Sequence, residues 1–270
     1  PEADEPLMLK LTQELFGSTD PDVNRSFEPA EFLNVVKDFE AYFVKLSEAR
    51  RAEPRDDLAT IIANAEIDGG QIPDHEANGY YMIIATAGHD TTSASTAGGL
   101  LGLINNPDQM AAFRNNVDGL MPTAIDEMIR WVSPVRHFMR TATADTEVAG
   151  QKIKAGESMI LWYPSANRDE TVYTDPNAFR IDRKEGKQIA FGFGAHVCLG
   201  QHLARMEMSS LFRKLLERVE HIELAGEPQY TQAVFVGGLK SLPIRYKMKK
   251  GWWLRSIGYS GVIWPSTCPC

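Results

Sequence analysis

A single cysteine lies where a glycine-rich loop is followed directly by a helical pattern. The loop covers residues 191–200, and residues 201–208 have the spacing of a helix. A thiolate at such a junction is stabilised by the positive end of the helix dipole and by unpaired backbone N–H groups. Cys198 is therefore predicted to be a metal ligand or a nucleophile, and a buried structural cysteine is the alternative. The glycines of the loop, which let the backbone approach a flat group, are Gly192, Gly194 and Gly200.

No second cysteine near Cys198 could complete a zinc or iron–sulfur ligand set, so the other ligands of a metal would come from a cofactor. This favours haem. The spacing Phe191-x-x-Gly194-x-x-x-Cys198-x-Gly200 resembles the haem-thiolate signature of cytochrome P450 monooxygenases. The resemblance implies heme b (iron protoporphyrin IX) as cofactor. It also implies Cys198 as the metal ligand, with Phe191, Gly192, Gly194 and Gly200 in the cofactor-binding loop.

Composition limits the classes of protein to consider. A chain of 270 residues that is 43% hydrophobic and 24% charged can bury a large core, which indicates a globular protein. A net charge of -8 argues against a nucleic-acid partner. We find no apolar run of membrane-spanning length and no signal segment, and therefore expect a cytoplasmic protein without membrane association. Three cysteines, two of them among the last three residues, do not form a disulfide framework.

Residues 73–104 are predicted to form one helix, about 48 Å long at 1.5 Å per residue. Its centre holds a glycine, an aspartate and two threonines, which helix interiors disfavour and which therefore indicate a working site. Gly88 removes bulk, and a threonine hydroxyl can bond back to a carbonyl one turn earlier. We expect a notch with a hydroxyl and a carboxylate beside it. The surrounding apolar residues, which indicate burial rather than a solvated polar patch, include Tyr80, Tyr81, Ile83, Ile84 and Leu100.

The central segment, residues 87–92, resembles the oxygen-activating motif of cytochromes P450, A/G-G-x-D/E-T-T/S. The resemblance implies that Asp90 and Thr91 are catalytic and steer protons to bound dioxygen, and that Ala87 lies beside the cofactor. A metal-dependent phosphohydrolase is the alternative interpretation of the doublet His89-Asp90. That class would need further histidine ligands upstream, and none follows the required pattern.

Glu127 and Arg130 are three residues apart on a helix predicted to begin at Pro122 and to end near Trp131, so they can pair. Such a pair is weak evidence alone. Its place between the two motifs resembles the family's E-x-x-R helix, and Arg183 matches the arginine that completes the pair. We expect these three residues to form a buried structural charge network that fixes the cysteine loop.

The fold class predicted is mainly α with small antiparallel β-sheets (α+β), which the resemblance makes a cytochrome P450 fold without its N-terminal part. Helices are expected at 6–17, 28–51, 57–66 and 200–219, and short strands at 136–142, 147–149, 158–162 and around residues 222 and 244. The apolar stripe of the second helix, expected to pack in the core, is Phe32, Val35, Val36, Phe39, Phe43 and Leu46.

Two regions are expected along the chain. Residues 1–247 would form the C-terminal part of a P450 haem domain. Residues 248–270 read as an atypical tail outside the fold, because they lack periodicity: an expression remnant, a frame change or a partner-binding appendage. Cys268 and Cys270 are too few ligands for a metal site.

Further site residues follow from the resemblance alone. Arg140 and His196 match donors that hold the haem propionates, as a buried dianionic edge requires, and a solvated arginine is the alternative for Arg140. The residues that match substrate-lining positions are Ala85, Val135, Phe138, Phe235 and Val236.

The resemblance implies a monooxygenase that inserts one oxygen atom of O2 into a C–H bond of a small hydrophobic substrate, terpene-like or alkylbenzene-like. A steroid or fatty acid is the alternative substrate class. The sequence has no flavin or nicotinamide motif, so electrons would come from an external ferredoxin and reductase. Candidate docking residues are Arg205, Arg213 and Lys214, for which a solvated basic face is the alternative. Because family members extend further at the N-terminus, a truncated, non-catalytic haem-binding fragment is the competing hypothesis, and a haem sensor or carrier is a more distant one.

Overall fold

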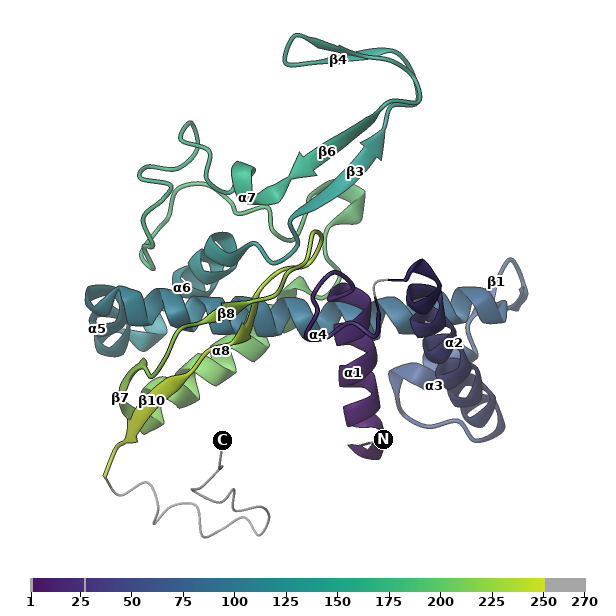
Figure 1. Ribbon diagram of the computed structural model, residues 1–270, viewed down its shortest axis with the longest axis horizontal. Helices are drawn as coiled ribbons and strands as arrows, with labels where there is room; N and C mark the ends of the chain where they lie inside the picture. The colour runs from purple at the N-terminus through teal and green to yellow at the C-terminus, as the bar shows by residue number, and fades with distance from the viewer. Residues whose placement is uncertain (1, 27, 251–270) are drawn as a thin grey trace.

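The computed structural model describes residues 2–26 and 28–250. Helices dominate, and within this part of the chain every β-sheet is an antiparallel pair of strands. Figure 1 shows the helices gathered along one long helix, with the strand pairs at its flanks. The predicted class, mainly α with small antiparallel sheets, is confirmed.

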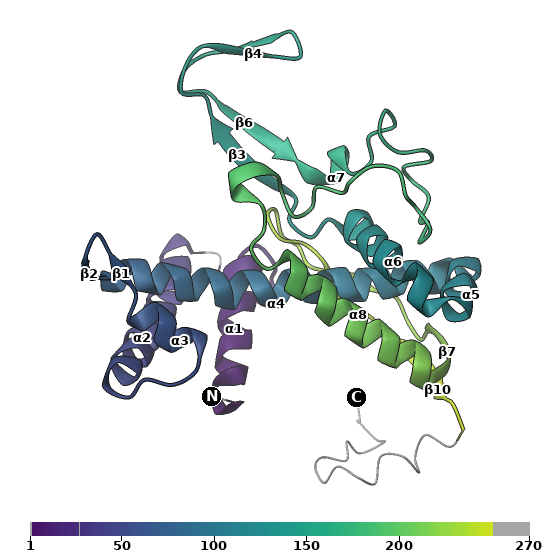
Figure 2. The same ribbon diagram turned by 180° about the vertical axis from the view of Figure 1, so that it is seen from behind.

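Helix α4 (Asp74–Asn105) is the axis of the molecule. It has 32 residues, as the sequence predicted within a residue at each end, and both views show it crossing the whole assembly of helices (Figures 1 and 2). Its apolar residues occur on all sides rather than on one stripe, which is typical of a helix packed by several neighbours. None of the helices in the described ranges is long and apolar enough to cross a membrane.

The N-terminal half of α4 packs against α1 (Glu5–Phe16), α2 (Pro29–Ala52) and α3 (Leu58–Ala63). Phe39, Phe43 and Tyr81 are buried there, with stacked rings whose centroids are 6.1 Å and 5.1 Å apart. The predicted stripe of α2 is correct for Val35, Phe39 and Phe43 but wrong for Phe32. That residue lies in the first turn of α2 and lines an open pocket instead of the core.

The C-terminal half of α4 packs in a second core with α5 (Pro107–Asn115), α6 (Val117–Val132) and α8 (Gln201–Arg218). A Cβ at Gly99 would lie 2.6 Å from Cγ of Met128, so glycine is what lets α4 and α6 approach this closely. The prediction that Pro122 opens the α6 helix is wrong. The helix begins five residues earlier, because the side chain of Asn116 accepts a hydrogen bond from the Gly119 amide and caps it.

The strand pairs are short. β3 (His137–Thr141) pairs with β6 (Ser158–Trp162), and β4 (Thr146–Val148) pairs with β5 (Gln151–Ile153). The β4–β5 turn is at Ala149 and Gly150, both with positive φ, which suits a two-residue hairpin turn. The other pairs are β7 (Val219–Leu224) with β10 (Ile244–Met248), β8 (Gln229–Tyr230) with β9 (Leu239–Ser241), and β1 (Glu66–Ile67) with β2 (Gly70–Gln71). The remaining short helices are η1 (Glu2–Asp4), α7 (Tyr163–Ala166) and η2 (Gly194–His196).

Candidate active site

The cysteine loop is closed by its own backbone. The N–H of Cys198 donates to the carbonyl of Phe191 at 2.8 Å, and the N–H of Gly192 donates to the carbonyl of Ile189 at 2.8 Å. Gly192 and Gly194 have φ of 72° and 71°, values that favour glycine, so these two positions fix the shape of the loop. The free, half-buried thiol of Cys198 thus stands three residues before the first residue of α8.

The side chains that flank this thiol are apolar and open. Val197 is 44% exposed and Leu199 is 95% exposed. A Cβ at Gly194 would meet nothing within 4 Å, and a Cβ at Gly200 would have the Sγ of Cys198 as its neighbour, at 4.0 Å. The loop therefore presents a sulfur between apolar groups, and its glycines leave space beside the backbone for a flat molecule.

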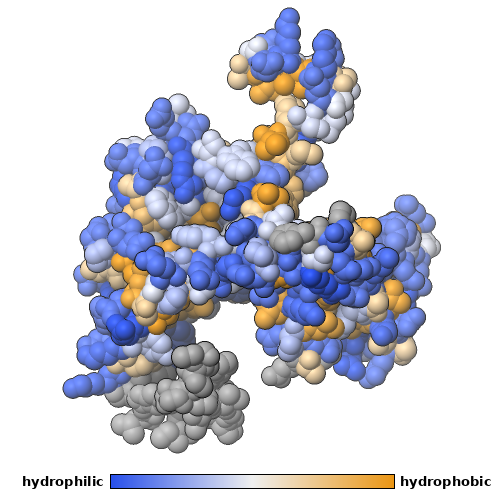
Figure 3. All heavy atoms as spheres, viewed as in Figure 1, coloured by the Kyte–Doolittle hydropathy of each residue, from blue (hydrophilic) through white to orange (hydrophobic). Residues whose placement is uncertain are grey.

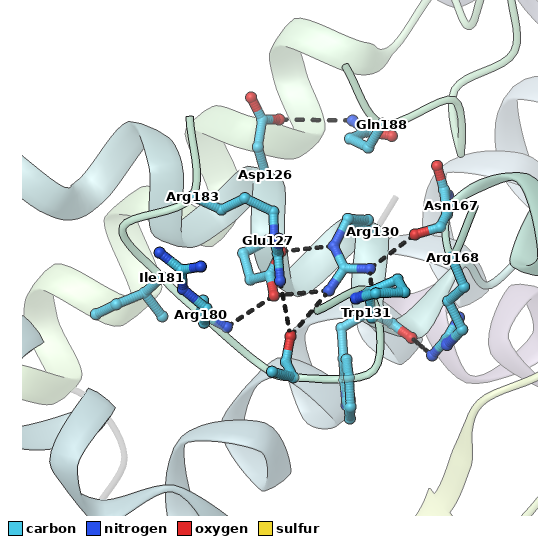
Figure 4. A network of polar contacts seen from close by, with 12 residues as sticks. Asp126, Glu127, Arg130, Trp131, Asn167, Arg168, Arg180, Ile181, Arg183 and Gln188 are labelled. Atoms are coloured by element: carbon cyan, nitrogen blue, oxygen red, sulfur yellow. Dashed lines mark hydrogen bonds and ion pairs between the residues drawn. The ribbon is translucent and has the colours of Figure 1, made fainter. Parts of the chain in front are cut away.

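Glu127 is the centre of a buried ion network (Figure 4). Its Oε2 accepts from Nε of Arg130 at 2.6 Å and from Nε of Arg183 at 3.2 Å. Its Oε1 accepts from Nη2 of Arg130 and from the backbone N–H of Arg180, both at 2.8 Å. Glu127, Arg130 and Arg183 are 2%, 1% and 7% exposed. The structure therefore brings together the three residues that the sequence analysis expected to pair.

The two arginines of this network bind the backbone that leads to the cysteine loop. Asn167, which is fully buried, accepts from Arg130 at its carbonyl (2.7 Å) and from the Ile189 amide at its side chain (2.8 Å). Ile189 is two residues before the loop begins, so the network holds the approach to the loop. Further carbonyls that accept from Arg130 or Arg183 are those of Thr174, Asp175, Pro176 and Ala178.

The centre of α4 contains the predicted back-bond. Oγ1 of Thr91 donates to the carbonyl of Ala87 at 2.6 Å. Beside it, Oδ1 of Asp90 lies 3.0 Å from Nδ1 of His89, while Oδ2 is buried and has no hydrogen-bond partner among the described residues. Burial raises the pKa of Asp90, and the hydrogen bond with His89 opposes that rise.

The expected burial around this motif is only partly correct. Tyr81 and Leu100 are buried, but Tyr80, Ile83 and Ile84 are exposed, because the described helices cover only one side of this part of α4. Gly88 and His89 line a groove of about 920 Å³ between α4 and α8. Gly88 therefore borders a groove, but Asp90 and Thr91, the expected carboxylate and hydroxyl, are not among the residues that line it.

The predicted substrate-lining residues come together in pairs. Val135 and Val236 form an isolated antiparallel bridge, and the rings of Phe138 and Phe235 are 5.3 Å apart. Figure 3 shows apolar side chains along β3 and β6, the strand pair that carries Phe138. Ala85 lies elsewhere and packs against the N-terminal helical core.

Comparison with known proteins identifies the family. The family model for cytochrome P450 matches residues 28–248. The chain belongs to the cytochrome P450 family.

The chain is similar to several cytochromes P450 and monooxygenases from bacteria. It is 47% identical over 254 residues to Cytochrome P450-terp of a Pseudomonas species, an alignment that covers 91% of this chain and 59% of that protein. It is 37% identical over 237 residues to linalool 8-monooxygenase of Pseudomonas putida, covering 88% of this chain and 58% of that protein. The crystal structure of CYP108D1 from Novosphingobium aromaticivorans matches with a TM-score of 0.82 and 47% identity, covering 92% of this chain and 58% of that chain. This P450 chain thus spans less than two thirds of the length of these relatives.

The cysteine loop of this P450 chain fits a flat iron cofactor, because the thiol of Cys198 could bind the iron and its neighbours are apolar. The expected propionate donors are less defined. His196 ends η2 on the surface, and the half-buried Arg140 donates from Nη1 to the carbonyl of Met139 at 2.9 Å. Both residues remain predicted donors.

Several residues at the site were not singled out from the sequence. Asn167 is one of them, and its buried hydrogen bonds give it a specific place in the network. His137 stacks on Trp162 at 5.5 Å and lies 5.9 Å from the ring of Phe235. The sequence contains a signal for the stacking of His137 on Trp162, because the two residues are opposite each other when the two predicted strands pair.

Proposed function

We propose that this chain acts in a haem-thiolate monooxygenase that inserts one oxygen atom of O2 into a C–H bond of a small hydrophobic substrate. The observation that carries the proposal is the half-buried thiol of Cys198 at the start of α8, a helix that packs against α4. The centre of α4 carries Asp90 and Thr91, so a thiol and an acid–alcohol pair belong to two helices in direct contact.

Cys198 would bind the iron of heme b, held by the cysteine loop with Arg140 and His196 as donors to its propionates. A thiolate-bound haem supplies the activation of dioxygen, because the thiolate favours cleavage of the O–O bond. The proton chemistry would belong to this chain. The hydroxyl hydrogen of Thr91 is donated to the Ala87 carbonyl, so its oxygen can accept a hydrogen bond from a protonated ligand. Asp90, with its raised pKa, retains a proton to higher pH than an exposed aspartate and is suited to donate it.

The substrate proposed is terpene-like or alkylbenzene-like. The contacts among Phe138, Phe235 and His137 support a small apolar ligand, since such pockets are lined mainly by aromatic and aliphatic groups. The names of two relatives, one of which specifies linalool, also support this class.

Electrons would come from an external ferredoxin and its reductase. The candidate docking residues Arg205, Arg213 and Lys214 each pair with an acidic side chain of this chain. A ferredoxin would therefore have to compete with Asp126, Asp118 and Glu217 for them.

The first test is spectroscopic. Carbon monoxide added to the reduced, haem-loaded protein should give the red-shifted Soret band of thiolate ligation. Cys198→Ser should abolish that band, whereas Cys268→Ser, which removes another of the three cysteines, should keep it. An unchanged spectrum in Cys198→Ser would refute the assignment of the ligand.

The second test is catalytic. With a ferredoxin, its reductase and NADH, linalool, limonene or propylbenzene should give an oxygenated product. Thr91→Ala should then lower the amount of product formed per NADH consumed by roughly ten-fold or more, with peroxide formed in its place. This is the effect expected when a group that handles protons is lost. A thiolate band without any turnover would instead favour the non-catalytic haem-binding fragment.

A further inference from the structure

A buried carboxylate joins two segments that are more than 200 residues apart in the sequence. Asp20, fully buried in the loop between α1 and α2, accepts from the Gln232 amide at 2.8 Å and from the Asp22 amide at 3.0 Å. It also accepts from Nζ of Lys240 at 3.2 Å and 3.3 Å. The bond from the Gln232 amide is the main reason why the pKa of Asp20 is below its ordinary value, and Lys240 adds to the effect.

The two segments lie side by side in both views, where the loop after α1 meets the chain between β8 and β9 (Figures 1 and 2). Two further contacts reinforce the junction. Lys240 also forms an ion pair with Asp22, and the hydroxyl of Thr19 donates to the carbonyl of Gln232. A carboxylate removed from water is tolerated only when its partners satisfy it, so Asp20 holds the loop to residues 229–241 as long as it keeps these partners.

Residues 229–241 lie against the candidate site. A Cβ at Gly238 would lie 2.4 Å from Cβ of Ala94, so this segment touches α4 one turn after Asp90 and Thr91. On its other side, the Arg136 amide donates to the Phe235 carbonyl at 2.9 Å. The segment is therefore held between α4 and the start of β3.

Phe16 connects the loop to this segment. It is the last residue of α1, four residues before Asp20, and its ring centroid lies 6.3 Å from that of Phe235. Phe235 in turn contacts Phe138 and His137. Phe16 directly precedes the loop that carries Asp20, so the loop and the aromatic cluster are adjacent along the chain and in space.

We propose that Asp20 is a positioning residue for substrate binding: through Lys240 and Gln232 it fastens residues 17–24 to residues 229–241 and so holds Phe16 against Phe235. The ligand class that benefits is a small apolar molecule enclosed by these rings. This inference rests on the proposed monooxygenase function, because it assigns the cluster to the substrate pocket of that enzyme.

The fastening itself is tested by amide hydrogen exchange, which requires no ligand. Asp20→Asn and Lys240→Met should each raise exchange in residues 17–24 and 229–241, and Lys240→Arg should keep the wild-type pattern. The matched control is Lys247→Met, which removes the ion pair with Glu220 in the β7–β10 sheet and should leave both segments unchanged. Unchanged exchange in Lys240→Met would overturn the proposal, even if Asp20→Asn failed to fold.

The positioning role is tested on the haem-loaded enzyme with linalool, limonene and propylbenzene, using whichever binds the wild type most tightly. Asp20→Asn and Lys240→Met each remove a hydrogen bond that involves a charged group. Each should raise the dissociation constant of the compound and its KM by roughly ten-fold, with kcat changed much less. Phe16→Ala should raise them similarly, and combining Phe16→Ala with Lys240→Met should give little further loss, because both act through one contact.

Additive effects of the two substitutions, or raised exchange with unchanged affinity, would overturn the positioning role. Failure of the proposed function is seen separately, because it appears in the wild type as a missing thiolate band or missing product. If the wild type gives the thiolate band but binds none of the three compounds, the substrate class and the positioning role both fail, and the exchange data show only whether Asp20 fastens the two segments.

Discussion

Glu127→Gln is the sharpest test of the buried ion network. The substitution keeps the size of the side chain but removes the charge that faces two buried guanidinium groups. The Glu127 carboxylate accepts four hydrogen bonds, three from Arg130 and Arg183 and one from the Arg180 amide. A glutamine has only one side-chain oxygen, so its NH2 group would face N–H groups that now donate to the carboxylate.

The expected loss can be worked from burial. Glu127 and Arg130 are almost completely buried, so water cannot replace the lost acceptor. Removing one partner of a buried pair costs about 3–5 kcal/mol, because the other charge remains uncompensated. For a chain of this size, 1 kcal/mol corresponds to roughly 2–4 °C in the melting temperature, so we expect a fall of about 6–20 °C.

Chemical and thermal unfolding, followed by circular dichroism, measure this loss. The matched control is Glu220→Gln, which removes the exposed pair with Lys247 and should cost at most about 1 kcal/mol. Because the network holds the approach to the cysteine loop, Glu127→Gln should also lower the haem content of purified protein. The reasoning is refuted if Glu127→Gln unfolds within 1 kcal/mol of the wild type, since the network would then behave like the surface pair.

Two further expectations concern α4. Gly99→Ala should destabilise the protein by about 1–3 kcal/mol, because its Cβ would press on Met128. Gly79→Ala, in open space on the same helix, should stabilise it by up to about 1 kcal/mol. Equal unfolding free energies in the two variants would contradict the close approach of α4 and α6. Because the pKa of Asp90 is raised above 3.8 in the folded protein, its protonated form stabilises the fold at low pH. This stabilisation is lost as the pH rises from 3.8 through the pKa of the folded state. The free energy of unfolding should therefore decrease more steeply with rising pH in this range for the wild type than for Asp90→Asn. Parallel profiles of the two proteins would show that Asp90 does not titrate as proposed.

The parts of the fold that the sequence predicted well depend on local spacing. The bounds of α4 follow from Pro73 and Pro107, which flank it, and the start of α8 follows from Gly200. The back-bond from Thr91 to Ala87 joins residues four apart on one helix, so it could be foreseen from the sequence. Each of these features is decided within one or two turns of the chain.

The parts that could not be predicted depend on what packs from a distance. An apolar residue on α4 reads the same whether its side of the helix is covered or open, so Tyr80 and Tyr81 could not be told apart although only Tyr81 is buried. The start of α6 was missed because an asparagine cap outweighed the proline signal. No local pattern indicated that Asp20 would meet Lys240, because a lone aspartate in a polar loop is ordinary.

The two long-range networks hold different segments of the chain. Glu127 and its arginines fix the chain that enters the cysteine loop, whereas Asp20 and Lys240 fix the segment that touches α4 at Ala94. They share no residue in the described structure, so each can fail without removing the partners of the other. Damage to the first network should therefore appear in cofactor content and global stability, and damage to the second in substrate affinity. In this P450 chain the cysteine loop and the loop beside the apolar cluster are thus held by two separate buried carboxylates, Glu127 and Asp20.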